Sequence, residues 1–188
     1  MMFSRARSFK GLWGNLKFLI SYKTWATLVI FIFGLLLGYG IFATVHAETL
    51  EERLKRHEGV RHCAYADQYG NPTIGVGHLL RKPVDMNTCW TSEQVERVLA
   101  HDIYRARHNA VADYGHGYYS LPQSVQDILT ELAFQLGGAG LEKFSTFLRL
   151  VQQGDYKAAS ADLLSTKLAN QLPKRTKEQA RILERAKQ

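Results

Sequence analysis

Residues 58–78 read EGVRHCAYADQYGNPTIGVGH, and the local structure that the sequence favours changes within this stretch. Gly59 ends the helix that the preceding residues favour, because glycine is a poor helix former. The YGNP run at 69–72 has the composition of a turn, and the TIGV run after it is β-prone. The sequence therefore predicts a helix that ends near His57, followed by a small sheet or hairpin within residues 65–76.

Helices are predicted on both sides of this β unit. Thr49 and Glu52 have the spacing of a capping box, and Thr91 and Gln94 repeat that spacing before a stripe of apolar residues at helical intervals. The expected fold is therefore α+β, with a small N-terminal β unit beside a larger helical lobe and a ligand-binding cleft between the two. Further helices are expected in the segments after residue 120, around 144–151, over 156–164 and over 176–186.

A long apolar segment precedes this domain. Residues 25–45 carry no charge, and as a helix they would span about 30 Å, the thickness of a bilayer core. Basic residues before the segment and acidic residues after it orient the helix with its N-terminus in the cytoplasm. The sequence thus predicts a basic cytoplasmic N-terminus over 1–24, a transmembrane or signal segment over 25–47, and a catalytic domain over 48–188.

The fate of the apolar segment stays open at the level of sequence. Val45 and Ala47 are small residues at the positions that a signal peptidase requires for a cut before Glu48. The length and strong hydrophobicity of the run favour instead an anchor that is retained. The expected location is therefore either the inner membrane, with the domain in the periplasm, or the periplasm after release.

The charge distribution argues against a nucleic-acid partner. The net charge is +7, but the first 47 residues hold five Lys and Arg and no acid. The remainder has 19 Lys and Arg against 17 Asp and Glu, whereas nucleic-acid binding needs a basic patch on the folded domain. A mildly basic domain suits an anionic cell-wall polymer.

Two cysteines, Cys63 and Cys89, leave two alternatives. In an oxidising compartment they could form a disulfide that closes a loop of about 25 residues, or they could remain free thiols. Neither has the neighbours of a zinc site. His57 and His62 do not form one either, because an i, i+5 pair does not share a helix face. No metal and no cofactor are therefore predicted.

Two carboxyl groups have the right kind of surroundings for glycoside hydrolysis, which needs one protonated and one ionised carboxyl. Glu58 lies at a helix end before a glycine, and Asp67 lies at a β edge beside a turn. The spacing alone is weak evidence, since most acidic residues near helix ends are simply solvated.

The wider pattern resembles the phage lysozyme family, glycoside hydrolase family 24. Eight residues separate Glu58 from Asp67 and five separate Asp67 from Thr73, as in that family. The FQLG run at 134–137 and the NQLPKR run at 170–175 resemble two further family motifs. The resemblance covers about residues 49–181 and implies a lysozyme-like fold.

The resemblance implies a monomeric endolysin that hydrolyses the β-1,4 bond between N-acetylmuramic acid and N-acetylglucosamine in peptidoglycan with inversion. Glu58 would be the general acid, Asp67 would direct the water, and Thr73 would help to hold that water. Arg175 would pair with Glu58. The supporting residues implied by the resemblance are Gln135 and Asn170, as sugar contacts, and His78 and Asp102, as an ion pair that ties the β unit to a long helix.

Three other functions compete with hydrolysis. A lytic transglycosylase needs the acid but no water-directing carboxylate, so the presence of Asp67 and Thr73 argues against it. A membrane-anchored wall-binding protein without activity would not need either carboxyl. A zinc amidase lacks its metal ligands.

Overall fold

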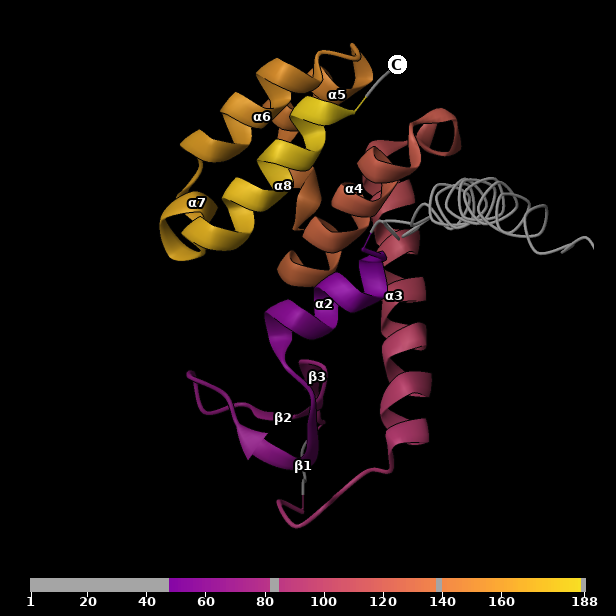
Figure 1. Cartoon of the computed structure of the whole chain (residues 1–188), viewed down its shortest axis with the longest axis vertical. Helices are drawn as coiled ribbons and strands as arrows, with labels where there is room; N and C mark the ends of the chain where they lie inside the picture. Colours follow the sequence, from indigo (N-terminus) through magenta and orange to yellow (C-terminus); the bar gives the residue numbers. More distant parts are fainter. Residues whose placement is uncertain (1–47, 82–84, 138–139, 187–188) are drawn as a thin grey trace, which may run out of the picture. The chain divides into compact units, whose positions relative to one another are not determined.

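The computed structural model describes residues 48–81, 85–137 and 140–186 (Figure 1). The predicted membrane segment, residues 25–45, lies outside this part of the chain. Among the residues that are described, no helix combines the length and the apolar character needed to cross a membrane.

The β unit forms in the predicted region, but it extends beyond the predicted residues 65–76 at both ends. Helix α2, Leu50–Glu58, begins at the Thr49 capping box and ends at Gly59, whose φ of 76° is a conformation that favours glycine. A three-stranded antiparallel sheet follows, in the order β1-β2-β3. Its strands are β1, Arg61–Ala66, β2, Pro72–Gly75, and β3, His78–Leu79.

Strand β1 begins four residues earlier than the prediction of residues 65–76 allowed. Two pairings account for this: Arg61 pairs with Gly75 of β2, and on the other edge the backbone N–H of Ala64 donates to Thr88 and that of Trp90 donates to His62. The second of these pairings joins segments about 25 residues apart, so local sequence does not reveal it.

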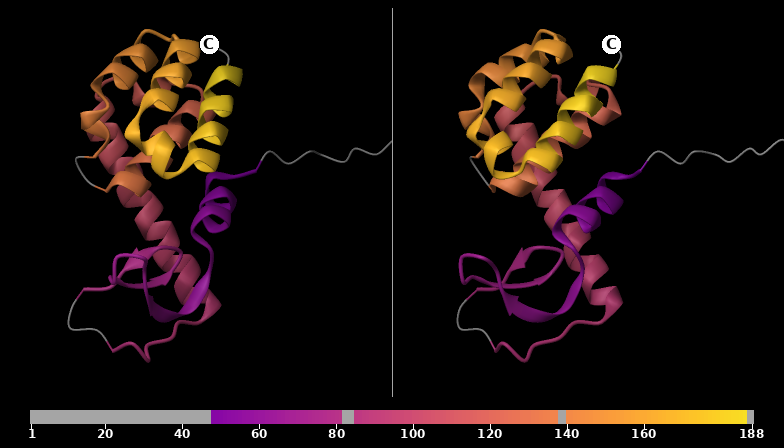
Figure 2. Two further views of the ribbon diagram at one scale, coloured as in Figure 1. Left: turned by 90° about the vertical axis from the view of Figure 1, so that its left-hand side faces the viewer. Right: turned by 60° about the vertical axis from the view of Figure 1, so that its left-hand side comes forward.

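The helical lobe is built around α4, Gln123–Leu136, whose apolar face is fully buried. Helix α3, Ser92–Tyr114, begins at the predicted Thr91 capping box and runs from the sheet to the helical lobe (Figure 2). The other α-helices in the described part of the chain are α5, Ser145–Gln152, α6, Tyr156–Ser165, α7, Lys167–Gln171, and α8, Pro173–Arg185.

Two details of the last helices differ from the prediction. Helix α8 was expected from residue 176 but begins at Pro173, because the fixed φ of proline suits the first position of a helix. The short helix α7 was not predicted at all. The predicted α+β class, with a small sheet and a larger helical lobe, is confirmed.

Two apolar cores hold the domain together. The larger lies within the helical lobe and includes Ile128, Leu132 and Phe147, all fully buried. The smaller joins α2, the segment after β2 and α3 through the side chains of Leu50, Leu54, Val76, Val95 and Leu99. This smaller core positions the end of α2 next to the sheet.

Candidate active site

Glu58 is the last residue of α2, and its carboxyl group lies against a buried arginine. Nη1 of Arg175, on α8, donates to Oε1 of Glu58 at 2.6 Å. The other carboxyl oxygen faces Gly77, where a Cβ atom would lie only 3.3 Å from Oε2. Glycine at position 77 therefore allows the backbone between β2 and β3 to approach the Glu58 side chain closely.

Glu131 on α4 also binds the guanidinium group of Arg175. Nε of Arg175 donates to Oε1 of Glu131 at 2.9 Å, and Nε of Arg53 on α2 donates to Oε2 at 2.7 Å. Glu131 is 0% exposed, Arg53 5% and Arg175 7%. We call these three residues, together with Glu58, the charged junction. It connects three helices.

His57 lies beside the charged junction. Its Nε2 is 3.3 Å from Oε2 of Glu178 and 3.8 Å from Oε1 of Glu131. Burial, followed by the positive charge of Arg175, lowers the pKa of His57 below its ordinary value. The imidazole is therefore neutral at pH 7 and adds no charge to the junction.

Asp67 lies in a different kind of environment, at the surface in the turn between β1 and β2. Its Oδ1 accepts from the backbone N–H groups of Tyr69 and Asn71, at 2.8 and 2.7 Å, and its Oδ2 accepts from Nδ2 of Asn71 at 3.0 Å. The backbone and side-chain donors of Asn71, and then the Tyr69 donor, lower the pKa of Asp67. The carboxylate is thus ionised at neutral pH and fixed in orientation.

Thr73 lies on β2, where it pairs with Tyr65 of β1 and with Leu79 of β3. Its side chain is 3% exposed, and its hydroxyl donates to the carbonyl oxygen of Asn71 at 3.2 Å. Asn71 therefore contacts both Asp67 and Thr73, so that one turn positions the two side chains.

The residues expected to support the site are placed as follows. Nδ1 of His78 lies 2.6 Å from Oδ2 of Asp102, which links β3 to α3. The amide of Gln135 on α4 is buried and has no hydrogen-bond partner among the described residues. Asn170 is exposed at the end of the short helix α7.

A pocket of about 340 Å³ opens between the sheet side and helices α3 and α4. Gly77, whose backbone lies close to the Glu58 side chain, is one of its lining residues, whereas Glu58 itself is not. Arg81 and Arg105 give the pocket a positive lining. The remaining lining residues are His78, Leu79 and Leu80 from the sheet side, Asp102, Ala106 and Asn109 from α3, and Ala133, Phe134 and Gly137 from α4 and its end.

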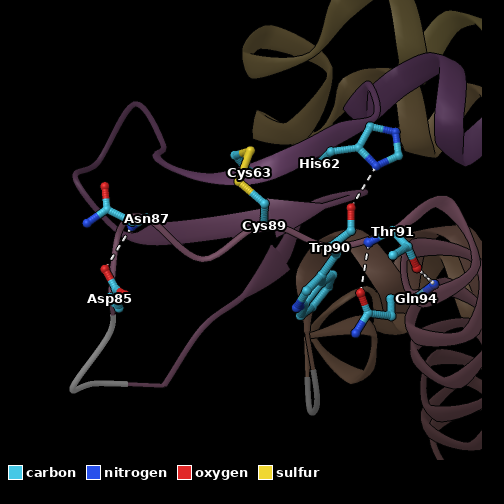
Figure 3. Close-up of a disulfide and its surroundings, with 8 residues drawn as sticks. All are labelled: His62, Cys63, Asp85, Asn87, Cys89, Trp90, Thr91 and Gln94. Atoms are coloured by element: carbon cyan, nitrogen blue, oxygen red, sulfur yellow. Dashed lines mark hydrogen bonds between the residues drawn. A yellow bond between two sulfur atoms is a disulfide. The ribbon is translucent and has the colours of Figure 1, made fainter.

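Cys63 and Cys89 are joined by a disulfide, the first of the two alternatives that the sequence left open (Figure 3). The bond links β1 to the segment that leads into α3, at the point where the two segments also form a β-bridge. Within the described ranges, no cluster of His, Cys, Asp and Glu has an arrangement that could hold a metal ion.

Sequence reasoning missed Arg53 and Glu131. A signal was available, because Glu131 stands within the run ILTELAF, on a helix whose other buried residues are apolar except for Thr130. A glutamate is almost never fully buried unless it is paired. The signal predicts a buried partner but does not identify it.

Comparison with known proteins supports the resemblance. The sequence profile of the phage lysozyme family matches residues 55–182. The chain is similar to an endolysin of Salmonella phage P22, with 33% identity over 70% of this chain and 92% of that protein. It is also similar to an endolysin of Acyrthosiphon pisum secondary endosymbiont phage 1, at 32% identity over 65% and 80%, and to a probable T4-type lysozyme of Dictyostelium discoideum, at 25% over 68% and 89%.

Proposed function

The chain belongs to the phage lysozyme family, and we propose that it is an inverting muramidase that cuts the β-1,4 bond between N-acetylmuramic acid and N-acetylglucosamine. Membership of the family implies a glycoside hydrolase that degrades peptidoglycan. The bond that is cut, the inverting mechanism and the identity of the catalytic residues go beyond what family membership implies and are our proposal.

The observation that carries the proposal is the contrast between the two carboxyl groups. In this mechanism Glu58 protonates the glycosidic oxygen, and Asp67 directs a water molecule onto the opposite face of the sugar. Asp67 suits that task because three donors fix it as an ion. Thr73 shares the Asn71 turn with Asp67 and helps to hold the water.

The pocket beside Glu58 supports peptidoglycan as the substrate. Guanidinium groups bind carboxylates well, and the peptide stems of peptidoglycan carry carboxylates. Arg81 and Arg105 line this pocket. We propose Gln135, whose side-chain amide has no hydrogen-bond partner among the described residues, as a contact for a sugar hydroxyl or acetamido group, and Asn170 as the second sugar contact.

The proposed location follows from residues 25–45. We place the domain in the periplasm, either tethered to the inner membrane by this segment or released from it. Fractionation of cells that express the full chain tests the tether: a periplasmic product that begins at Glu48, without a membrane-bound form, would exclude a retained anchor.

The activity is tested with the full chain in mild detergent on isolated Gram-negative peptidoglycan. Glu58→Gln is expected to lower the rate about a thousandfold, within the range typical of a lost general acid, and Asp67→Asn is expected to lower it strongly as well. Matched controls are Glu51→Gln, which removes an exposed carboxyl from the same helix, and Asp85→Asn, which changes an aspartate that also accepts a turn N–H.

Mass spectra of the products separate the competing functions. Muropeptides with free reducing ends support hydrolysis. Anhydro-muropeptides would instead identify a lytic transglycosylase, in which Asp67 would have no role in directing water. If the folded protein binds the wall and releases nothing, it is a wall-binding protein.

A further inference from the structure

The charged junction holds a carboxylate that the proposed mechanism does not use. Glu131 is fully buried in the middle of α4 and accepts from two arginines that come from different helices. We propose that Glu131 is a positioning residue, which orients Arg175 toward Glu58 and balances the charge of the two arginines. This inference rests on the proposed role of Glu58 as general acid.

The orientation argument follows from the shape of the guanidinium group. Its nitrogen atoms lie in one rigid plane, so fixing one N–H donor fixes the directions of the others. Glu131 binds Nε of Arg175, and the same plane then directs Nη1 toward Oε1 of Glu58. Without Glu131, the Arg175 side chain would lose the contact that sets this direction.

The charge argument follows from counting the charged side chains that α2, α4 and α8 place at the charged junction. Helix α2 contributes Arg53 and the neutral His57, α4 contributes Glu131, and α8 contributes Arg175. Glu178, also on α8, lies next to His57 and pairs with the surface residue Arg56. Arg53, Glu131 and Arg175 therefore sum to one positive charge behind Glu58, whereas without Glu131 the sum would be two.

The energetics of burial suggest that this arrangement serves the site. Burying ionised groups is costly, and well-packed apolar residues often stabilise a fold as well as a buried ion cluster does. The buried cluster in this chain includes Glu58, the residue proposed as the acid, whose Oε1 lies 2.6 Å from Nη1 of Arg175. The cluster therefore contacts the site directly, which a role in stability alone would not require.

The test measures the pH profile of kcat/KM on peptidoglycan for the full chain in detergent. Glu131→Gln leaves two uncompensated cations, which favour an ionised carboxyl, so the basic limb should move down by about one pH unit. Arg53→Met leaves no net charge and should move the limb upward, by less. The double variant Arg53→Met/Glu131→Gln restores the single positive charge and should return the limb close to that of the unmodified protein.

Arg56→Gln is the matched control, because it removes an arginine from the same helix whose partners, Glu48 and Glu178, lie outside the charged junction. Its basic limb should not move. Circular dichroism establishes which variants fold. If Glu131→Gln does not fold, the opposite shift in Arg53→Met and its reversal in the double variant still decide the question.

A loss of activity in all three variants without movement of the basic limb would overturn the proposal, and Glu131 would then only support the fold. Failure of the proposed function has a different signature. In that case Glu58→Gln would retain the activity of the unmodified protein, whatever the profiles of the junction variants show.

Discussion

The two proposed catalytic carboxyl groups are held by opposite means. Glu58 lies where three helices meet and depends on buried side chains that are far apart in sequence. Asp67 lies in the turn after β1, a strand that has no buried residue, and donors within four residues fix it. We call the surroundings of Glu58 the helical side of the site and the surroundings of Asp67 the sheet side. The helical side is therefore linked to the stability of the fold, whereas the sheet side is organised by contacts that are local in sequence.

The largest expected effect tests the helical side. Arg53→Met removes one of the two arginine partners of a fully buried carboxylate and should lower the free energy of unfolding by about 4 kcal/mol, as for other broken buried ion pairs. Asp67→Ala should leave the unfolding midpoint almost unchanged, because its hydrogen bonds lie at the surface. Chemical denaturation measures both, with Arg56→Met as the exposed control. Equal losses for Arg53→Met and Asp67→Ala would contradict the comparison.

The next effect tests the sheet side. Replacing Cys63 and Cys89 by serine opens a loop of 26 residues and should lower stability by about 3 kcal/mol, on the loop-entropy model. Hydrogen exchange should increase more in β1 than in α4, since β1 has little apolar burial to replace the bond. An equal increase in both elements would show that the two regions unfold as one unit.

Much of the fold could be predicted because its signals are local. The two capping boxes and Gly59 place helix ends through contacts within four residues, and both boxes form as predicted. The second pairing of β1 and the partners of Glu131 join residues 24 or more positions apart. Such contacts are decided by packing in three dimensions, which residue spacing does not encode.

The proposed site likewise combines residues that a local sequence motif places with a contact between residues that are distant in sequence. The positions of Glu58, Asp67 and Thr73 follow from a spaced motif, and the donors to Asp67 could have been expected from the turn composition of residues 69–72. The contact between Arg175 and Glu58 spans 117 residues. Its expectation came from resemblance to a family and not from any property of the local sequence.

The smallest expected effect is a change in the pKa of Asp67 that leaves the overall stability of the fold nearly unaffected. Asn71→Ala removes the side-chain donor to Asp67 and leaves the backbone donors, so the pKa of Asp67 should rise part of the way toward its ordinary value. A carboxyl with a lowered folded pKa contributes stability above its unfolded pKa, and this contribution is lost as the pH falls through the folded pKa. Because Asp67 must be ionised to direct the water, the acid limb of the activity profile should move upward in the variant together with this pKa.

Carbon-13 NMR of the Asp67 carboxyl and the acid limb of kcat/KM measure the same titration by independent means. Asn87→Ala is the control, since Asn87 lies in the corresponding turn beside Asp85. If the limb moves while the unfolding midpoint at pH 7 falls only slightly, Asp67 is tuned by its own turn. If the midpoint falls as far as in Arg53→Met, the sheet side is also linked to global stability, and the two carboxyl groups do not differ in the way that the structure indicates.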